Sequence, residues 1–219
     1  MASLKLGGSL RVVVGPMFAG KTSEIQSIVR RFGCLGASVL VLTADIDNRY
    51  QSKVAAIVNH DRAALPARAV AVEGLGEVLE WPDFAAATAV VVDEAQFFVG
   101  CLIPFVRAAV DNHGKHVIVV GLDSDSEQRP FGDVLALMAH ADTIEKKTAL
   151  CRSCGDGTAA IFTRRLGAVE GQVAVGGSDL YEPVCRRHFN SSLPPSSPSL
   201  PSSSASRPAA LWLPSSLKR

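Results

Sequence analysis

The sequence has few of the features that place a protein in a membrane or outside the cell. Its longest apolar runs, around Val12 and Val91, extend over about six residues, whereas a helix needs ~20 to cross a bilayer. The chain does not begin with the charged and then apolar pattern of a secretory signal. Its five cysteines are an odd number for a disulfide framework, and metal binding is the better interpretation without an export signal. We therefore expect a soluble cytoplasmic protein with no membrane partner.

An excess of charge of either sign is also missing. Lys and Arg number 22 and Asp and Glu number 21, which leaves a formal net charge of +1. A surface that binds nucleic acid through many phosphate contacts is basic, so we expect no nucleic-acid partner. Any anionic ligand is then held by a few placed groups. With 47% hydrophobic and 20% charged residues, the composition is that of a globular protein.

Two residue types dominate the end of the sequence. Residues 191–219 include 11 Ser and 6 Pro, and their only large apolar cluster surrounds Trp212. Such a segment cannot bury enough apolar surface to offset the entropy of ordering it. We predict a disordered tail over 191–219, with a docking motif at Trp212 as the alternative, and a flexible N-terminus over 1–8.

Between residues 9 and 149, short apolar runs alternate with helical patterns. Uninterrupted Val-rich strands that alternate with helices are typical of a parallel sheet covered on both faces, which is an α/β fold. The predicted strands are 9–14, 38–43, 67–72, 88–93 and 116–121, and the predicted helices are 21–33, 95–112 and 131–140. From about residue 150, cysteines and Gly pairs replace this pattern and indicate a small module over 150–190.

A glycine-rich segment follows the first predicted strand. Residues 15–22 match G-x-x-x-x-G-K-[ST] and stand between a strand and a helix, as phosphate binding requires. Glycines let successive N–H groups face one phosphate, and the helix N-terminus adds partial positive charge. Lys21 would bridge the β- and γ-phosphates and Thr22 would ligate Mg²⁺. The alternative is a Gly-rich turn that happens to contain Lys-Thr. The predicted ATP-binding residues of this phosphate loop are Gly15, Pro16, Met17, Phe18, Ala19, Gly20, Lys21 and Thr22.

The fourth predicted strand ends in two acidic residues, Asp93 and Glu94. This acidic pair would lie at the carboxyl edge of the parallel sheet, where α/β proteins bind ligands. Asp93 suits Mg²⁺ binding, directly or through water, and Glu94 suits proton abstraction from a nucleophile. The alternative is that the two acids begin the next helix, where the dipole favours them. The phosphate loop upstream favours the metal-and-base interpretation.

Two short knuckles near the end of the folded region carry metal-ligating residues. Cys151 and Cys154 form the first, and Cys185 and His188 form the second, with 30 residues between them. Three thiolates and one imidazole complete a tetrahedron and leave no open position, so we predict a structural Zn²⁺. The alternative is unconnected buried cysteines with a surface histidine. The remaining cysteines, Cys34 and Cys101, are interpreted as core residues.

Several short motifs follow one another in order over residues 10–189. They are G-P-M-F-A-G-K-T-S-E (15–24), D-N-R-Y (47–50), D-E-A-Q-F-F (93–98), G-L-D (121–123) with R-P-F-G (129–132), T-R-R-L-G (163–167), G-G-S-D-L-Y (176–181) and the two knuckles. Together they resemble the motifs of one family, the type II thymidine kinases. One position departs from the family pattern, because Ser126 stands where an aromatic residue is expected. This difference bears on substrate range more than on reaction type.

The resemblance implies a RecA-like P-loop sheet joined to a zinc module whose loop covers the nucleoside. Carried over position by position, it makes Glu94 the general base on the 5′-hydroxyl of the deoxyribose. It assigns ATP and Mg²⁺ to the phosphate loop, Asp93, Arg49 and Gln96. It assigns the nucleoside to Met17, Phe97, Leu122, Phe131, Thr163, Arg165, Val175, Gly176 and Tyr181. Arg49 and Arg165 are candidate phosphate clamps. A homotetramer and inhibition by dTTP are also implied.

We therefore expect transfer of a phosphoryl group from ATP to thymidine, with deoxyuridine as a further candidate substrate. Two alternatives remain open at this point. The first is a P-loop ATPase acting on DNA, which should show a basic face and DNA-stimulated hydrolysis. The second is a catalytically silent nucleotide-binding relative, which Ser126 makes plausible.

Overall fold

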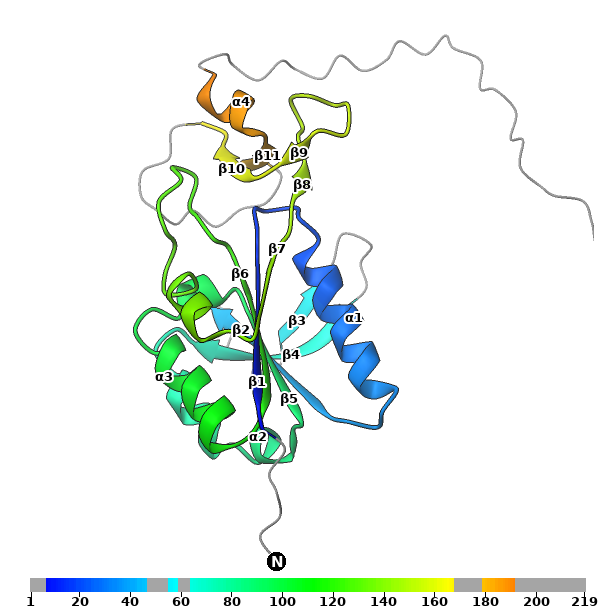
Figure 1. The fold of residues 1–219 in the computed structure, drawn as a ribbon, viewed down its shortest axis with the longest axis vertical. Helices are drawn as coiled ribbons and strands as arrows, with labels where there is room; N and C mark the ends of the chain where they lie inside the picture. Colours follow the sequence, from blue (N-terminus) through cyan, green and yellow to red (C-terminus); the bar gives the residue numbers. More distant parts are fainter. Residues whose placement is uncertain (1–6, 47–54, 59–63, 168–178, 192–219) are drawn as a thin grey trace, which may run out of the picture.

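A twisted seven-stranded sheet forms the centre of the molecule (Figure 1). The computed structural model describes residues 7–46, 55–58, 64–167 and 179–191. Six strands run parallel in the order β4 (Ala64–Ala71), β2 (Val39–Asp45), β5 (Ala89–Asp93), β6 (His116–Gly121), β1 (Ser9–Val14) and β7 (Thr143–Lys146). At one edge, β3 (Ala55–Val58) pairs antiparallel with β4.

Helices cover both faces of the sheet because the central strands are apolar on both sides. All five residues of β5 are buried. Along β1, Val12 and Val14 pack into one apolar cluster and Val13 packs into the other, as the alternation of a strand requires. The continuous apolar runs seen in the sequence are therefore strands buried on both faces.

One face is covered by α1 (Lys21–Gly33), which packs Ile25 and Ile28 against the sheet, with Val29 and Phe32 beside them. This spacing of three and four residues places all four side chains on one side of the helix. The other face is covered by η1 (Leu75–Glu80), α2 (Pro82–Ala86), η2 (Ala95–Phe97), α3 (Leu102–Arg107), η3 (Ala108–Asn112) and η4 (Ala136–His140).

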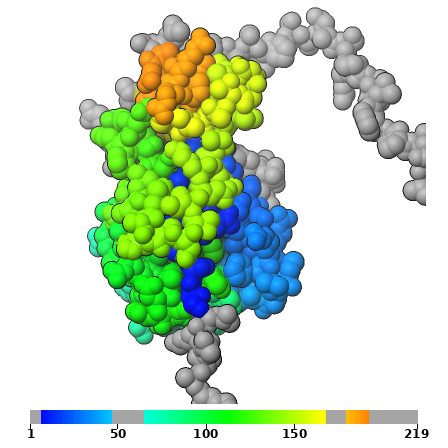
Figure 2. Space-filling model, viewed as in Figure 1, coloured from blue at the N-terminus to red at the C-terminus, as the bar shows by residue number. Residues whose placement is uncertain are grey.

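The small module extends from the carboxyl edge of the sheet (Figures 1 and 2). It consists of two antiparallel pairs and a short helix: β8 (Ala149–Leu150) with β9 (Ala159–Ala160), β10 (Phe162–Arg165) with β11 (Tyr181–Val184), and α4 (Arg186–Asn190). Its small apolar cluster also takes in Phe18 and Ala19 of the phosphate loop. The loop and the module therefore share a packing contact.

The fold class expected from the sequence is confirmed. It is a RecA-like parallel sheet with helices on both faces, joined to a module that carries a Cys₃His cluster. The strand over 9–14, the helix over 21–33 and the strand over 116–121 have the predicted bounds. The predicted flexible N-terminus and tail lie almost wholly outside the described residues.

Two predicted helices are interrupted. Instead of one helix over 95–112, the chain forms η2, which ends at Phe97, then a turn in which Gly100 adopts a left-handed φ of 79°, and then α3 and η3. Within 131–140 only η4 is helical, because Gly132 turns at φ 60° where its backbone meets the Gln96 carbonyl. The polar edge strand β7 lacks an apolar pattern, and the sequence did not predict it.

Candidate active site

The phosphate loop and the acidic pair lie at the same edge of the sheet. The loop follows β1 and the acidic pair ends β5, and only β6 separates these two strands. The loop depends on glycine at both ends. Gly15 has a φ of 152°, and a Cβ there would come within 2.5 Å of the Lys147 carbonyl oxygen. Gly20 takes a φ of 74° at the N-cap of α1 and offers the first turn no side-chain acceptor.

Lys21 lies inside the curl of this loop. Its ammonium donates hydrogen bonds to the carbonyl oxygens of Gly15 (3.0 Å) and Pro16 (2.7 Å). Burial lowers the pKa of Lys21, while the negative charges of Glu94, Asp93 and Asp123 act in the opposite direction. The ammonium is therefore within electrostatic reach of three carboxylates.

Asp93 and Glu94 differ in their surroundings. Asp93 is 6% exposed, and burial and then the adjacent charge of Glu94 raise its pKa to about 7. Glu94 adopts a left-handed φ of 52°, a conformation that costs about 1–3 kcal/mol for a residue other than glycine. Oxygen ligands of this kind are what Mg²⁺ prefers, so the acidic pair fits a magnesium site.

The side chain of Gln96 is hydrogen-bonded to the carboxylate of Glu94. Gln96 is fully buried, and its Nε2 donates to Glu94 Oε2 at 2.5 Å. Its Oε1 accepts from the Leu122 backbone N–H at 3.0 Å. Only one orientation of the amide satisfies both bonds, because the carboxylate must accept and the N–H must donate. The resemblance assigns Gln96 to ATP, whereas the described contacts of its side chain are with Glu94 and Leu122.

The residues predicted to bind nucleoside fall into two groups. Phe97 and Phe131 meet edge to face, with ring centroids 5.5 Å apart, near the carboxyl ends of β5 and β6. In the small module, Thr163 is buried and its Oγ1 accepts from the Met17 backbone N–H at 3.0 Å. Tyr181 lies against the guanidinium of Arg165, 5.6 Å from ring centroid to Cζ. The predicted residues Arg49, Val175 and Gly176 lie outside the described residues.

The four predicted zinc ligands come together. Their ligand atoms all lie within 4.8 Å of one another. His188 Nδ1 is 3.5 Å from Cys151 Sγ, 3.3 Å from Cys154 Sγ and 3.4 Å from Cys185 Sγ, and the Sγ atoms of Cys154 and Cys185 are 3.8 Å apart. A tetrahedron with Zn–S of about 2.3 Å and Zn–N of about 2.0 Å has edges of about 3.5–3.8 Å. These residues therefore fit Zn²⁺ with a closed set of ligands.

Backbone hydrogen bonds prepare one of these thiols for a metal. Burial raises the pKa of Cys151, but hydrogen bonds from the Cys185 and Cys154 backbone and from the neighbouring ligands outweigh burial and lower it to about 6. The Cys185 backbone N–H lies 3.2 Å from Cys151 Sγ.

Of the other two cysteines, Cys101 packs against the core as predicted, whereas Cys34 is exposed and the core prediction for it was wrong. Cys34 is the C-cap of α1, beyond the last turn that faces the sheet.

A ring of charges that the sequence did not predict supports the base of the phosphate loop. Arg11 on β1 pairs with Glu24 on α1 and with Glu145 on β7, and Lys147 pairs with the same two glutamates at 3.0 and 2.7 Å. The ring joins the strand before the loop, the helix after it and β7. No sequence signal could find it, because its members are up to 136 positions apart.

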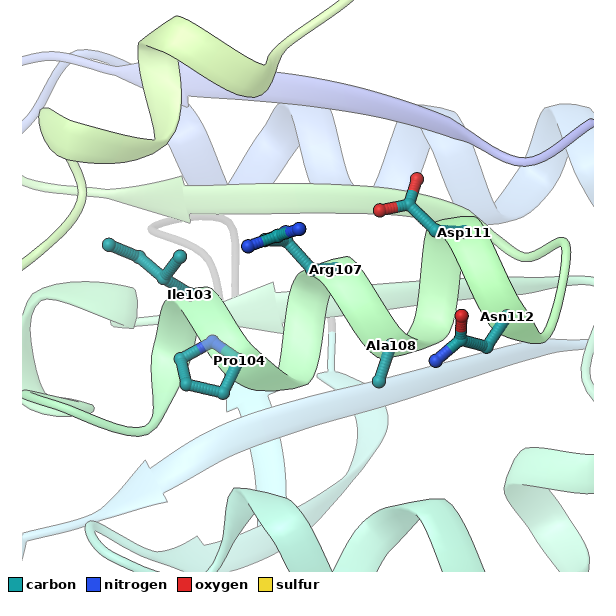
Figure 3. A pocket seen from close by; sticks show the side chains of 6 residues that line it. All are labelled: Ile103, Pro104, Arg107, Ala108, Asp111 and Asn112. Atoms are coloured by element: carbon teal, nitrogen blue, oxygen red, sulfur yellow. The ribbon is translucent and has the colours of Figure 1, made fainter.

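A separate hollow of about 320 Å³ lies along α3 and η3 (Figure 3). It is lined by Ile103, Pro104, Arg107, Ala108, Asp111 and Asn112. None of the predicted site residues that the structure describes lines this hollow.

A parallel sheet whose phosphate loop and acidic pair share one edge places the chain among the nucleotide-binding α/β proteins. Comparison with known proteins narrows this class. A family model described as thymidine kinase matches residues 8–189. The chain belongs to the thymidine kinase family, and it is an enzyme of that family.

Relatives from distant organisms match most of the chain. The cytosolic thymidine kinase of Homo sapiens is 38% identical over 188 residues, which cover 83% of this chain and 73% of the relative. Thymidine kinase a of Arabidopsis thaliana is 36% identical over 188 residues, with 83% and 75% covered. The thymidine kinase of Rhodothermus sp. (strain ITI 518) is 38% identical over 212 residues, with 94% and 95% covered.

Among solved structures, AMPPCP-bound DnaA from Aquifex aeolicus matches with a TM-score of 0.38 at 11% identity, covering 67% of this chain and 42% of that chain. This likeness is too distant to support an argument. Within the part of the chain that the structure describes, every helix is too short or too polar to span a bilayer.

Proposed function

We propose that this enzyme transfers the γ-phosphoryl group of ATP to the 5′-hydroxyl of thymidine, with deoxyuridine as a further substrate. The observation that carries the proposal is the shared edge of the sheet, where the phosphate loop and the acidic pair lie on either side of β6. Membership of the thymidine kinase family supports the choice of nucleoside.

Each group at this edge has a role that its chemistry suits. Lys21 and the amides of the phosphate loop would hold the triphosphate, and Thr22 and Asp93 would hold Mg²⁺, which neutralises phosphate charge. Glu94 would accept the proton of the 5′-hydroxyl. The 5′-oxygen would form a bond to the γ-phosphorus while the bond between the γ-phosphorus and the β,γ-bridging oxygen breaks. ADP leaves with that oxygen. Because transition states of this kind are loose, positioning and charge neutralisation supply most of the rate.

The nucleoside would lie between the sheet edge and the small module. Phe97, Leu122 and Phe131 offer apolar contact from the sheet side, which suits a flat, uncharged pyrimidine. From the loop and the module side, we assign Met17, Thr163, Arg165, Val175, Gly176 and Tyr181, with Arg49 and Gln96 assigned to ATP by the family resemblance. Residues 9–149 would then form the nucleotide-binding core and 150–190 the module, with a structural Zn²⁺ closing it.

Assembly, regulation and location are proposed from the family alone. We infer a homotetramer, inhibition by dTTP and a cytoplasmic location, since relatives named as cytosolic include the human one. Size-exclusion chromatography with light scattering tests the first and a dTTP titration of activity tests the second.

Incubation of the full chain with labelled ATP, Mg²⁺ and each of the four deoxynucleosides tests the activity. We expect thymidine monophosphate as the main product, with no stimulation of ATP hydrolysis by DNA. Hydrolysis that depends on DNA would replace the proposal with an ATPase acting on DNA. ATP binding without phosphorylation of any nucleoside would show that the chain is a catalytically silent nucleotide-binding relative. Ser126, in place of the expected aromatic residue, would then be the first position to examine.

A further inference from the structure

A third carboxylate, Asp123, lies at the edge of the sheet between the two parts of the proposed site. Asp123 follows β6, the strand that separates the phosphate-loop strand β1 from the acidic strand β5. In the sheet register, Gly121 of β6, Val14 of β1 and Lys146 of β7 form one row. Asp123 is two residues beyond this row, at the level of the phosphate loop.

The two carboxylate oxygens of Asp123 have different surroundings. The residue is 7% exposed, and Oδ2 pairs with the Lys146 ammonium at 2.6 Å. The other oxygen, Oδ1, is buried and has no hydrogen-bond partner among the described residues. Because a buried acceptor without a partner destabilises the fold, such an oxygen indicates a ligand that donates a hydrogen bond to it.

Lys146 reaches Asp123 because of the alternation along β7. Neighbouring side chains on a strand point to opposite faces. Lys147 pairs with Glu24 on the α1 side, and Lys146 crosses the end of β1 to pair with Asp123. The Lys146 side chain is 51% exposed, so the ion pair by itself adds little stability, but it fixes which oxygen of Asp123 remains available.

The charge of Asp123 excludes a direct contact with a triphosphate, since two anions repel each other. The ligand of Oδ1 must therefore be a cation or a hydrogen-bond donor. Lys21 is within electrostatic reach of Asp123, but its ammonium donates to the carbonyls of Gly15 and Pro16. The remaining donor that a nucleotide brings to this edge is the water shell of its magnesium ion, because Mg²⁺ keeps several of its waters when it binds to proteins.

We propose that Asp123 Oδ1 accepts a hydrogen bond from a water of the hydrated magnesium ion of Mg-ATP, and that Lys146 positions the carboxylate through its other oxygen. This inference rests on the proposed binding of Mg-ATP at the phosphate loop. It adds to the acidic pair a third acidic group that acts on the metal without direct ligation.

The test measures ATP binding by titration calorimetry in the absence of nucleoside, at a series of Mg²⁺ concentrations and in EDTA. Asp123→Asn keeps the shape and the bond to Lys146 but loses the charge. We expect the Mg²⁺ concentration for half-maximal ATP binding to rise roughly tenfold, which corresponds to about 1.4 kcal/mol. ATP binding in EDTA should become tighter, because a negative charge near the phosphates is gone. These opposite directions distinguish an effect on the metal from a general loss of structure.

Asp125→Asn is the matched control, because Asp125 is a buried aspartate of the same loop whose oxygens accept from the backbone N–H groups of Glu127 and Arg129 and from the Arg129 guanidinium. We expect this variant to lower thermal stability and leave the Mg²⁺ midpoint unchanged.

Three results would overturn the inference. They are an unchanged Mg²⁺ midpoint in Asp123→Asn, an equal loss of ATP binding with and without Mg²⁺, and a rise in the KM for thymidine alone, which would make a nucleoside hydroxyl the ligand of Oδ1. If the wild-type chain itself binds no ATP with Mg²⁺, the proposed function fails and the inference fails with it.

Discussion

Gln96 and Glu94 are joined by a hydrogen bond of 2.5 Å between the side-chain amide and the carboxylate, inside a backbone turn that holds Glu94 at a left-handed φ of 52°. The amide occupies Oε2 and is itself fixed through the Leu122 backbone. If Glu94 is the base, as we propose, Oε1 would then be the oxygen that receives the proton of the hydroxyl. In that mechanism we infer that Gln96 positions the proposed base.

Replacement of this amide should slow turnover more than it weakens binding. In Gln96→Leu, Glu94 loses its donor and the Leu122 N–H loses its acceptor, so the base is no longer held in one orientation. We expect kcat to fall by about 10- to 100-fold with a KM for ATP within about threefold of wild type, measured by steady-state kinetics. Gln96→Glu, which places a carboxylate against Glu94, should be at least as slow. A large rise in the KM for ATP at unchanged kcat would instead favour the direct ATP contact that the family resemblance implies.

Removal of the base itself should separate chemistry from nucleotide binding. Glu94→Gln keeps the size of the side chain and removes its ability to take a proton. We expect turnover to fall by ~10²-fold or more while the Kd for Mg-ATP changes little. Rapid-quench measurement of thymidine monophosphate and calorimetry of ATP binding check the two parts. Phosphorylation at the wild-type rate would show that another group accepts the proton.

Loss of a zinc ligand should unfold the small module, because its apolar cluster contains just five buried residues among those that the structure describes. We expect native mass spectrometry to find one zinc ion per chain in the wild type. Cys185→Ser should lose this ion, melt at a lower temperature and lose thymidine binding. Cys34→Ser and Cys101→Ser are matched controls, since both thiols lie outside the Cys₃His cluster. Full zinc content in Cys185→Ser would argue against this ligand set.

Acid should weaken the charge ring beneath the phosphate loop. Burial opposes ionisation of Glu24, but its pKa is lowered by Lys147 and Arg11, and the pKa of Glu145 is lowered by hydrogen bonds from the same two residues. Both carboxylates bind protons less readily in the folded state than in the unfolded state. Their contribution to stability is therefore complete above the ordinary glutamate pKa of about 4.3, and it is lost as the pH falls through the folded-state values.

Urea unfolding at a series of pH values between about 3 and 7 measures this effect. Glu145→Gln should lower stability at neutral pH and flatten the decline in acid, whereas Glu77→Gln, at an exposed glutamate on η1, should leave the profile unchanged. If the free energy of unfolding of Glu145→Gln depends on pH in the same way as that of the wild type, Glu145 does not contribute to the loss of stability in acid.

The sequence predicts those parts of the fold where local pattern and tertiary environment agree. The strand over 9–14 and the helix over 21–33 follow from a continuous apolar run and from apolar residues spaced by three and four. The prediction of one helix over 95–112 was wrong. The helical periodicity of the sequence continues through Gly100, but in the structure Gly100 lies in a turn with a left-handed φ. The strand β7 is polar, and only its pairing with β1 makes it a strand.

Local sequence patterns determined which side chains are candidates for phosphate, metal and proton chemistry. A phosphate-binding loop, a pair of metal ligands and an acidic strand end each involve only a few consecutive residues. Tertiary structure decided what surrounds them. It joined the Gln96 amide to the Leu122 backbone, left one oxygen of Asp123 without a partner among the described residues and joined Arg11 to Glu145 on the adjacent strand β7. Such contacts depend on strand order and register, which bring distant residues together and which no local pattern encodes.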